Sequence, residues 1–264
     1  MKSSLRNSIA AWLVAALCGV GELTPKSADA AEETRCGRES GSAAAVEAKK
    51  LLGELRGELA DVENQIRNHP YLKNLEGKQV SQANLKAFAG EQYNIIRSDL
   101  RSDALMVTRF GTTNNGKMLR DIMDGEVQAL GMLLDFAKAL GLDEDQLRSY
   151  EPRPGAQAYP AYAASLALYG SEADIAAALL MNFSIFGENT GRMSAALKSN
   201  YGLTPRDVAF FDFFASPMPD FECDALAMIE AGLEHGAEPY AAKRAARLLQ
   251  AYEKLFWDTV AETR

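Results

Sequence analysis

The chain has 264 residues, of which 47% are hydrophobic and 24% are charged. This is enough apolar sequence to bury one sizeable core, so a single folded domain is the default expectation. The formal net charge is -8, and the basic residues are scattered among acidic ones. A nucleic-acid-binding surface needs clustered Lys and Arg, so we expect no nucleic-acid partner.

The N-terminal segment has the pattern of a targeting signal. Lys2 and Arg6 precede an apolar run, and Ala28-Asp29-Ala30 offers a cleavage site of the small-x-small type. The apolar run is too short to span a bilayer. We predict a signal peptide at 1–30 and a disordered linker at 31–42, which would place the mature protein in the periplasm without a membrane contact. The alternative is an uncleaved extension of a cytoplasmic protein.

Three cysteines do not make a disulfide framework, and Cys18 would leave with the signal peptide. Cys36 and Cys223 could pair after export. Because Cys36 lies in a polar segment, we expect two unpaired thiols instead. Neither has a His nearby in sequence that would indicate a thiolate nucleophile.

The N-terminal half shows apolar residues at spacings of three and four, which is typical of helices with one buried face. His69-Pro70 ends the first helix, Ser81 is a candidate N-cap for the second, and Gly141 is a candidate C-cap for the third. The predicted helices cover 43–66, 81–110 and 118–140.

The C-terminal half continues this pattern. The proline-rich segment Tyr150–Pro160 predicts a bend, Ser171 is a candidate N-cap, and Thr204-Pro205 has the chemistry of a helix start. The predicted helices cover 161–169, 171–200, 204–217, 220–235 and 240–262. No segment alternates with a period of two for long enough to form a convincing strand. The sequence therefore predicts an all-α bundle of about seven or eight helices in one domain at 43–264.

Polar side chains interrupt the apolar faces of three predicted helices. Glu91 and Gln92 lie on the second helix, Asn182 on the long fifth one, and Glu253 on the last. A buried polar group costs several kcal/mol unless it is hydrogen-bonded. Each residue alone fits an ordinary satisfied core or surface position. Their occurrence on three helices favours a pocket.

Five motifs together resemble the TenA/thiaminase II and PqqC-like superfamily, whose members share the haem-oxygenase-like helical bundle. The resemblance covers about residues 45 to 261. The order and spacing of the motifs carry it, because each motif alone is weak. They are HPY after the first helix, LKAFAGEQYNII, PGAQAYPAY, IAAALLMNFSIFGENTG and AYEKLFWDTV.

In thiaminase II enzymes this bundle holds an aminopyrimidine, which a Cys attacks while carboxylates bind the amine and transfer protons. The resemblance places the closing Glu of the thiaminase II pocket at Glu253 and a pocket Tyr at Tyr159. The nucleophilic Cys position falls on Asn182, a second pocket Tyr on Phe186, and the pocket Asp on Gln92. An amide cannot act as a thiolate or bind an amidine-like ring as a carboxylate does.

These departures indicate a small-molecule pocket with altered chemistry, for a pyrimidine-like or other heteroaromatic ligand related to thiamin salvage. We expect Glu253 to bind an amine or act as acid and base, with a pKa raised by the apolar side chains around it, Trp257 among them. Tyr159 and Phe186 would stack on the ring. Gln92, Asn182 and Glu91 would hydrogen-bond its edge.

Two alternatives stay open. One is a non-enzymatic regulator or scaffold that acts through protein contacts. The other is an oxidase similar to PqqC or to the chlamydial CADD protein, but His69 and His235 are the chain's two histidines, and Ala129 stands where a Glu126-x-x-His pair would need a ligand. We therefore expect neither metal nor cofactor. The resemblance also implies a homo-oligomer.

Overall fold

The computed structural model describes residues 41–262, so the predicted signal peptide and most of the predicted linker lie outside the described residues. The described part contains helices and no strand, which confirms the all-α prediction. The helices are α2 (Ala43–Arg67), α3 (Pro70–Glu76), α4 (Gln82–Phe110), α5 (Lys117–Ala139), α6 (Glu144–Arg148), α7 (Pro154–Tyr169), α8 (Glu172–Tyr201), α9 (Ala209–Ala215), α10 (Phe221–Glu234) and α11 (Pro239–Ala261), with a short 3-10 turn η1 (Asn114–Gly116) before α5.

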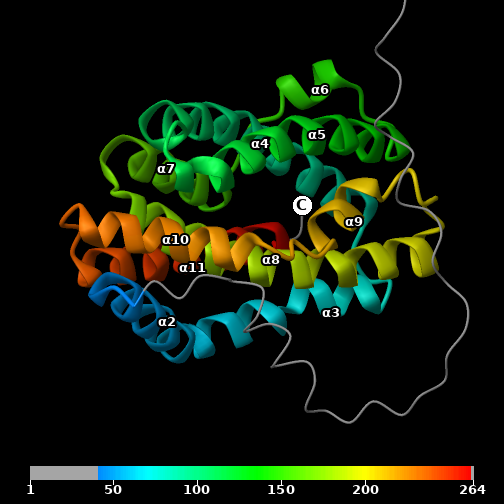
Figure 1. The fold of residues 1–264 in the computed structure, drawn as a ribbon. Coiled ribbons are helices and arrows are strands. Elements are labelled where there is room, and N and C mark those ends of the chain that lie inside the picture. Colours follow the sequence, from blue (N-terminus) through cyan, green and yellow to red (C-terminus); the bar gives the residue numbers. More distant parts are fainter. Residues whose placement is uncertain (1–40, 263–264) are drawn as a thin grey trace, which may run out of the picture. The chain divides into compact units, whose positions relative to one another are not determined.

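Three groups of helices build the bundle. Figure 1 shows α8, α10 and α11 between α2 and α3 on one side and α4, α5 and α7 on the other. α11 packs against both α7 and α8, and the short α9 packs against α8 and α5. The inner faces of α4, α5, α7, α8, α9 and α11 therefore meet in the interior of the bundle.

Local capping interactions set several helix ends where the sequence predicts them. Ser42 and Ser81 accept hydrogen bonds from the first turns of α2 and α4. Ser171 and Asp174 form a capping box at the start of α8, and Gly202 ends that helix with a φ of 71°. Each interaction satisfies backbone groups that the helix end leaves without a partner.

Two predicted boundaries are wrong, and both corrections involve proline. The predicted bend at Tyr150–Pro160 is mostly helix, because α7 begins at Pro154 and continues through Pro160. Pro154 occupies a first-turn position, where the missing N–H costs no hydrogen bond. Conversely, the predicted helix at Thr204 begins only at Ala209. Thr204 Oγ1 donates to Asp207 Oδ2 over 2.6 Å, but these residues form a turn.

Cys223 on α10 is disulfide-bonded, so the expectation of an unpaired thiol there is wrong. Its partner lies outside the described residues. The sequence could not reveal the bond, because cysteine pairing depends on proximity in space. No helix in the described part of the chain is both long and apolar enough to cross a membrane.

Aromatic side chains fill the core between α4, α5, α9 and α11. Phe136 and Phe211 meet edge to face with centroids 4.9 Å apart, and Phe88 lies 5.7 Å from Phe211 and 5.8 Å from Phe256. Phe256 in turn meets Trp257 at 5.3 Å. Such contacts contribute about 0.5–1.5 kcal/mol per pair beyond area burial. This rigid aromatic cluster holds α11 against α4.

Gly187 on α8 permits the close approach of α9. A Cβ atom at this position would lie 2.7 Å from the carbonyl oxygen of Phe214. We expect Gly187→Ala to lower the free energy of unfolding by about 1–3 kcal/mol, because the clash is with backbone that must move. Chemical denaturation would measure the change. Gly57→Ala on α2 is the control, since a Cβ atom there meets nothing within 4 Å. Equal effects of the two variants would contradict the prediction.

Candidate functional site

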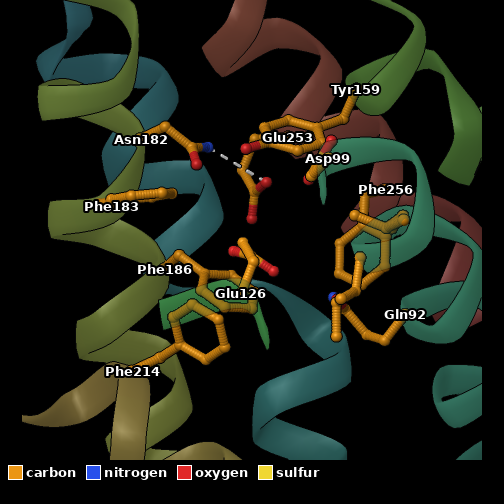
Figure 2. A pocket seen from close by; sticks show the side chains of 12 residues that line it. Gln92, Asp99, Glu126, Tyr159, Asn182, Phe183, Phe186, Phe214, Glu253 and Phe256 are labelled. Carbon is orange, nitrogen blue, oxygen red and sulfur yellow. Dashed lines mark hydrogen bonds between the residues drawn. The ribbon is translucent and has the colours of Figure 1, made fainter. Parts of the chain in front are cut away.

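A cavity of about 30 Å³ lies where α4, α5, α7, α8, α9 and α11 meet. Its polar lining consists of Gln92, Asp99, Glu126, Tyr159, Asn182 and Glu253. Its apolar lining consists of Ile95, Ile96, Phe183, Phe186, Phe214 and Phe256. Figure 2 shows these side chains around one common space. A single water needs about 10–15 Å³ of such volume, so the cavity has room for about two small polar groups.

The structure brings five of the seven predicted site residues to this cavity: Gln92, Tyr159, Asn182, Phe186 and Glu253. They come from four helices that are far apart in sequence. Their roles toward a ligand stay predictions, but their convergence is a property of the fold. All five are buried.

Glu253 is fixed by two hydrogen bonds. Asn182 Nδ2 on α8 donates to Glu253 Oε2 over 3.2 Å, and Trp257 Nε1, one turn further along α11, donates to Glu253 Oε1 over 2.7 Å. Both carboxyl oxygens therefore have a donor in the protein. The Asn182 bond links the two helices across the cavity and holds the carboxyl group in one orientation (Figure 2).

Burial raises the pKa of the Glu253 carboxyl from 4.5 to about 7. The hydrogen bonds from Asn182 and Trp257 oppose this shift, because they stabilise the charged form. The net result is a group that can both accept and donate a proton near neutral pH. This agrees with the raised pKa predicted from the apolar residues around Glu253.

Three further buried acids lie beside Glu253. Asp99 and Asp103 are one helical turn apart on α4, and Glu126 comes from α5. Each has one buried carboxyl oxygen without a hydrogen-bond partner: Oδ1 of Asp99, Oδ2 of Asp103 and Oε2 of Glu126. Asp99 and Glu126 line the cavity, and Figure 2 shows both side chains reaching it. A buried acceptor without a donor is costly, so this cluster needs an explanation.

Burial raises the pKa values of all three acids, and neighbouring negative charges add to the shifts of Asp99 and Glu126. Burial raises the pKa of Asp103 to about 7 and, with repulsion from Asp103, that of Glu126 to about 8. Burial also raises the pKa of Asp99 well above its usual range, and the negative charges of Glu126, Asp103 and Glu253 add to the shift. Carboxyl groups this close cannot all ionise without a compensating charge.

Sequence reasoning missed Asp99 and Asp103. The available signal was their spacing, which puts both acids on the inward face of the second helix. Glu126 was considered only as half of a metal-ligand pair. Among residues 41–262, no group of three or more His, Cys, Asp or Glu side chains is arranged to hold a metal ion.

Two predicted ligand-binding residues do not line the cavity. Glu91 is fully buried beneath the start of α7. It accepts from Tyr150 Oη over 2.8 Å and from the Arg153 guanidinium Nε over 3.0 Å. Its neighbour in sequence, Gln92, faces the cavity, because adjacent residues on a helix point about 100° apart. Trp257 does not line the cavity, and its contact with the site is the hydrogen bond from its indole N–H to Glu253.

A larger hollow adjoins the cavity, and Phe183 and Phe214 line both spaces. This outer hollow has a volume of about 380 Å³ and shares Glu126, Phe183 and Phe214 with the cavity. Phe214 meets Phe186 edge to face at 5.1 Å, and Phe183 stacks on Phe221 at 5.6 Å. Phe183 and Phe214 therefore contact aromatic neighbours where the two spaces adjoin.

Solved structures with this arrangement of helices define the fold class. A TenA homolog from Pseudomonas syringae pv. tomato matches with a TM-score of 0.68 and 13% identity, over 79% of this chain and 91% of that one. A TenA homologue from P. horikoshii OT3 matches with a TM-score of 0.66 and 16% identity, over 80% and 97%. A domain of unknown function from Shewanella denitrificans OS217, described as having a heme oxygenase-like fold, matches with a TM-score of 0.64 and 16% identity, over 79% and 91%.

The bundle is thus a haem-oxygenase-like fold, as the sequence resemblance implied. The model of the TENA/THI-4/PQQC family matches residues 56–263, and the chain belongs to this family. A comparison with curated proteins found no match.

The buried acids predict how stability depends on pH. Their folded-state pKa values of about 7 for Glu253 and Asp103 and about 8 for Glu126 lie above the usual 4.5 for Glu and 3.8 for Asp. Between these limits the folded state holds protons that the unfolded state has lost. We therefore expect the free energy of unfolding to fall as pH rises from about 5 through about 8. Urea denaturation across this range would measure the slope.

Glu126→Gln should flatten this slope, because the amide cannot ionise. The matched control is Glu151→Gln, which changes an exposed acid between α6 and α7. A wild-type slope in Glu126→Gln would show that Glu126 does not hold its proton in the folded state.

The placement of Glu91 predicts a structural role. Glu91→Gln should lower the free energy of unfolding by about 3–5 kcal/mol, because it removes the buried countercharge of the Arg153 guanidinium and leaves only the exposed Glu262, 3.6 Å away. Chemical denaturation would measure the loss. The exposed variant Glu151→Gln should change stability by less than about 0.5 kcal/mol. An unaltered stability of Glu91→Gln would contradict this role.

Proposed function

We propose that the cavity binds a small molecule with a pyrimidine-like or other heteroaromatic ring, and that Glu253 serves as its anchor and acid–base group. The observation that carries the proposal is the buried Glu253 carboxyl, oriented by Asn182 and Trp257 toward a space lined by aromatic side chains. A functional pocket typically combines an apolar lining with a few convergent polar groups.

The lining offers suitable contacts for such a ring. Tyr159 and Phe186 provide flat surfaces for stacking, and the amides of Gln92 and Asn182 supply both donors and acceptors for the ring edge. Glu253 has a pKa of about 7, which suits proton transfer near neutral pH. Membership of the TENA/THI-4/PQQC family supports a ligand related to thiamin salvage.

The chemistry we propose differs from that of thiaminase II. Asn182 occupies the position that the family resemblance assigns to the nucleophilic Cys, and it donates to Glu253. An amide cannot form the covalent bond that a thiolate forms. Proton transfer by Glu253 is therefore the reaction that we assign to the site, without a covalent intermediate on the residue at 182.

Ring binding requires the cavity to expand. A volume of about 30 Å³ is well below the roughly 300–1,000 Å³ of ordinary ligand pockets. Phe183 and Phe214 also border the outer hollow of about 380 Å³, so their outward rotation would join the two spaces. We propose that ligand entry follows this route.

A thermal-shift experiment tests the proposal. We expect the hydroxymethyl aminopyrimidine half of thiamin to raise the melting temperature of the wild-type protein, because a ligand that binds only the folded state stabilises it by about 2.7 kcal/mol at a hundredfold excess over Kd. Glu253→Gln should weaken binding by about tenfold or more, which corresponds to about 1.4 kcal/mol.

The matched control is Glu151→Gln, which should bind like the wild type. Related heterocycles from thiamin breakdown would extend the series. The proposal fails if none of these compounds stabilises the wild-type protein, or if Glu253→Gln and Glu151→Gln bind them equally well.

A further inference from the structure

The acidic cavity and the outer hollow adjoin each other, share Glu126, Phe183 and Phe214, and differ in chemistry. α5 carries residues of both: Met118 and Ile122 line the hollow, and Glu126 borders both spaces. The hollow is lined mainly by apolar side chains, among them Phe213, Met218 and Phe221. An apolar space therefore adjoins buried carboxyl groups.

The inner part has acceptors but no positive charge. Asp99, Glu126 and Glu253 line the cavity, and none of its lining residues in the described chain is Lys, Arg or His. Asp99 and Glu126 are both more than nine-tenths buried, and each has an oxygen without a hydrogen-bond partner. A positively charged hydrogen-bond donor would stabilise such oxygens most strongly.

An organic ammonium group meets this requirement. It offers three N–H donors and a positive charge in a volume close to that of one water molecule, which fits a cavity of about 30 Å³. A divalent metal ion suits the site less well, because no three acidic, His or Cys side chains in residues 41–262 are arranged to hold one. A neutral ring would bring no positive charge to these oxygens.

We infer that the ligand of this site is a primary amine whose ammonium group binds Asp99 and Glu126 and whose apolar body lies in the outer hollow. This inference rests on one part of the proposed function, namely that the cavity binds a small molecule, and it assigns a chemical class to that molecule. The hollow of about 380 Å³ falls within the usual range for ligand pockets, whereas the cavity alone accommodates only the head group.

The rim of the hollow favours the entry of a cation. Lys117 is the one basic residue that lines it, and it forms ion pairs with Asp121 and, over 3.7 Å, with Asp224. Asp220 also lines the hollow. These acids outnumber the lysine, so the rim carries net negative charge, which raises the local concentration of cations.

Amine binding is coupled to proton release. The titratable groups that face the ammonium site are Asp99 and Asp103 from α4, Glu126 from α5, Tyr159 from α7 and Glu253 from α11. Protons on these carboxyl groups compete with the ammonium group. Affinity should therefore rise between about pH 6 and pH 8.5, and each bound amine should release protons to the buffer.

Isothermal titration with phenylbutylamine tests the inference. We expect phenylbutylamine to bind at least tenfold more tightly than phenylbutanol, which lacks the charge, and than benzylamine, which is too short to occupy the hollow. The measured heat should vary with the ionisation enthalpy of the buffer, which reports proton release.

Variants separate the two parts of the site. Glu126→Gln and Asp99→Asn should each weaken phenylbutylamine at least tenfold, whereas the exposed control variants Glu151→Gln and Asp61→Asn should bind like the wild type. Met218→Asn should weaken phenylbutylamine but not benzylamine, because Met218 lines only the apolar part. Circular dichroism would confirm that each variant is folded. Both acid variants replace an ionisable carboxyl group by an amide of nearly the same size.

Three results would overturn the inference. Phenylbutanol could bind as tightly as phenylbutylamine, the acid variants could bind the amine like the wild type, or Mn²⁺ could stabilise the protein through Glu126 where the amine does not. If the aminopyrimidine binds in a Glu253-dependent manner while phenylbutylamine does not bind, the inference fails and the proposed function stands. If only the amine binds, through Asp99 and Glu126, the heteroaromatic proposal fails instead.

Discussion

The burial of acidic side chains in the centre of the bundle is the constraint on which the site depends. Glu253 is held by Asn182 and Trp257, so its carboxyl group is oriented even without a ligand. Asp99 and Glu126 lack such donors on one oxygen each. Burial raises the pKa of Glu253 to about 7, that of Glu126 to about 8 and that of Asp99 well above its usual range. A bound cation would compete with the protons that these carboxyl groups hold.

Packing of the aromatic core offsets the free-energy cost of burying these acids. Phe88, Phe136, Phe211 and Phe256 form a contiguous cluster next to the acids, and Gly187 lets α9 approach α8 closely enough for Phe214 to contact Phe186. The same side chains exclude water and thereby raise the carboxyl pKa values. The tight packing that stabilises the bundle is thus also the cause of the raised carboxyl pKa values, and Phe183 and Phe214 line both the cavity and the outer hollow.

Family membership and fold define the helical bundle, but they do not define the chemistry of its cavity. The structural relatives share 13–16% identity with this chain, which is evidence for the common bundle only. Within that bundle, Asn182 stands at the position that the resemblance assigns to a nucleophile, and the acids of α4 and α5 add negative charge to the cavity. These two features are the grounds on which we propose recognition and proton transfer in place of covalent catalysis.

The sequence by itself determined the longer helices and most of their ends, because apolar periodicity and caps such as Ser81 and Ser171 act over a few residues. It did not predict the short helices α3 and α6. The family resemblance also predicted the meeting of Tyr159, Asn182 and Glu253. Tertiary structure alone decided the role of Glu91, the bond of Cys223 and the clustering of Asp99 with Glu126. The reason is physical: the environment of an acid or a thiol depends on which distant helix faces it, and one helix's own pattern does not contain that information.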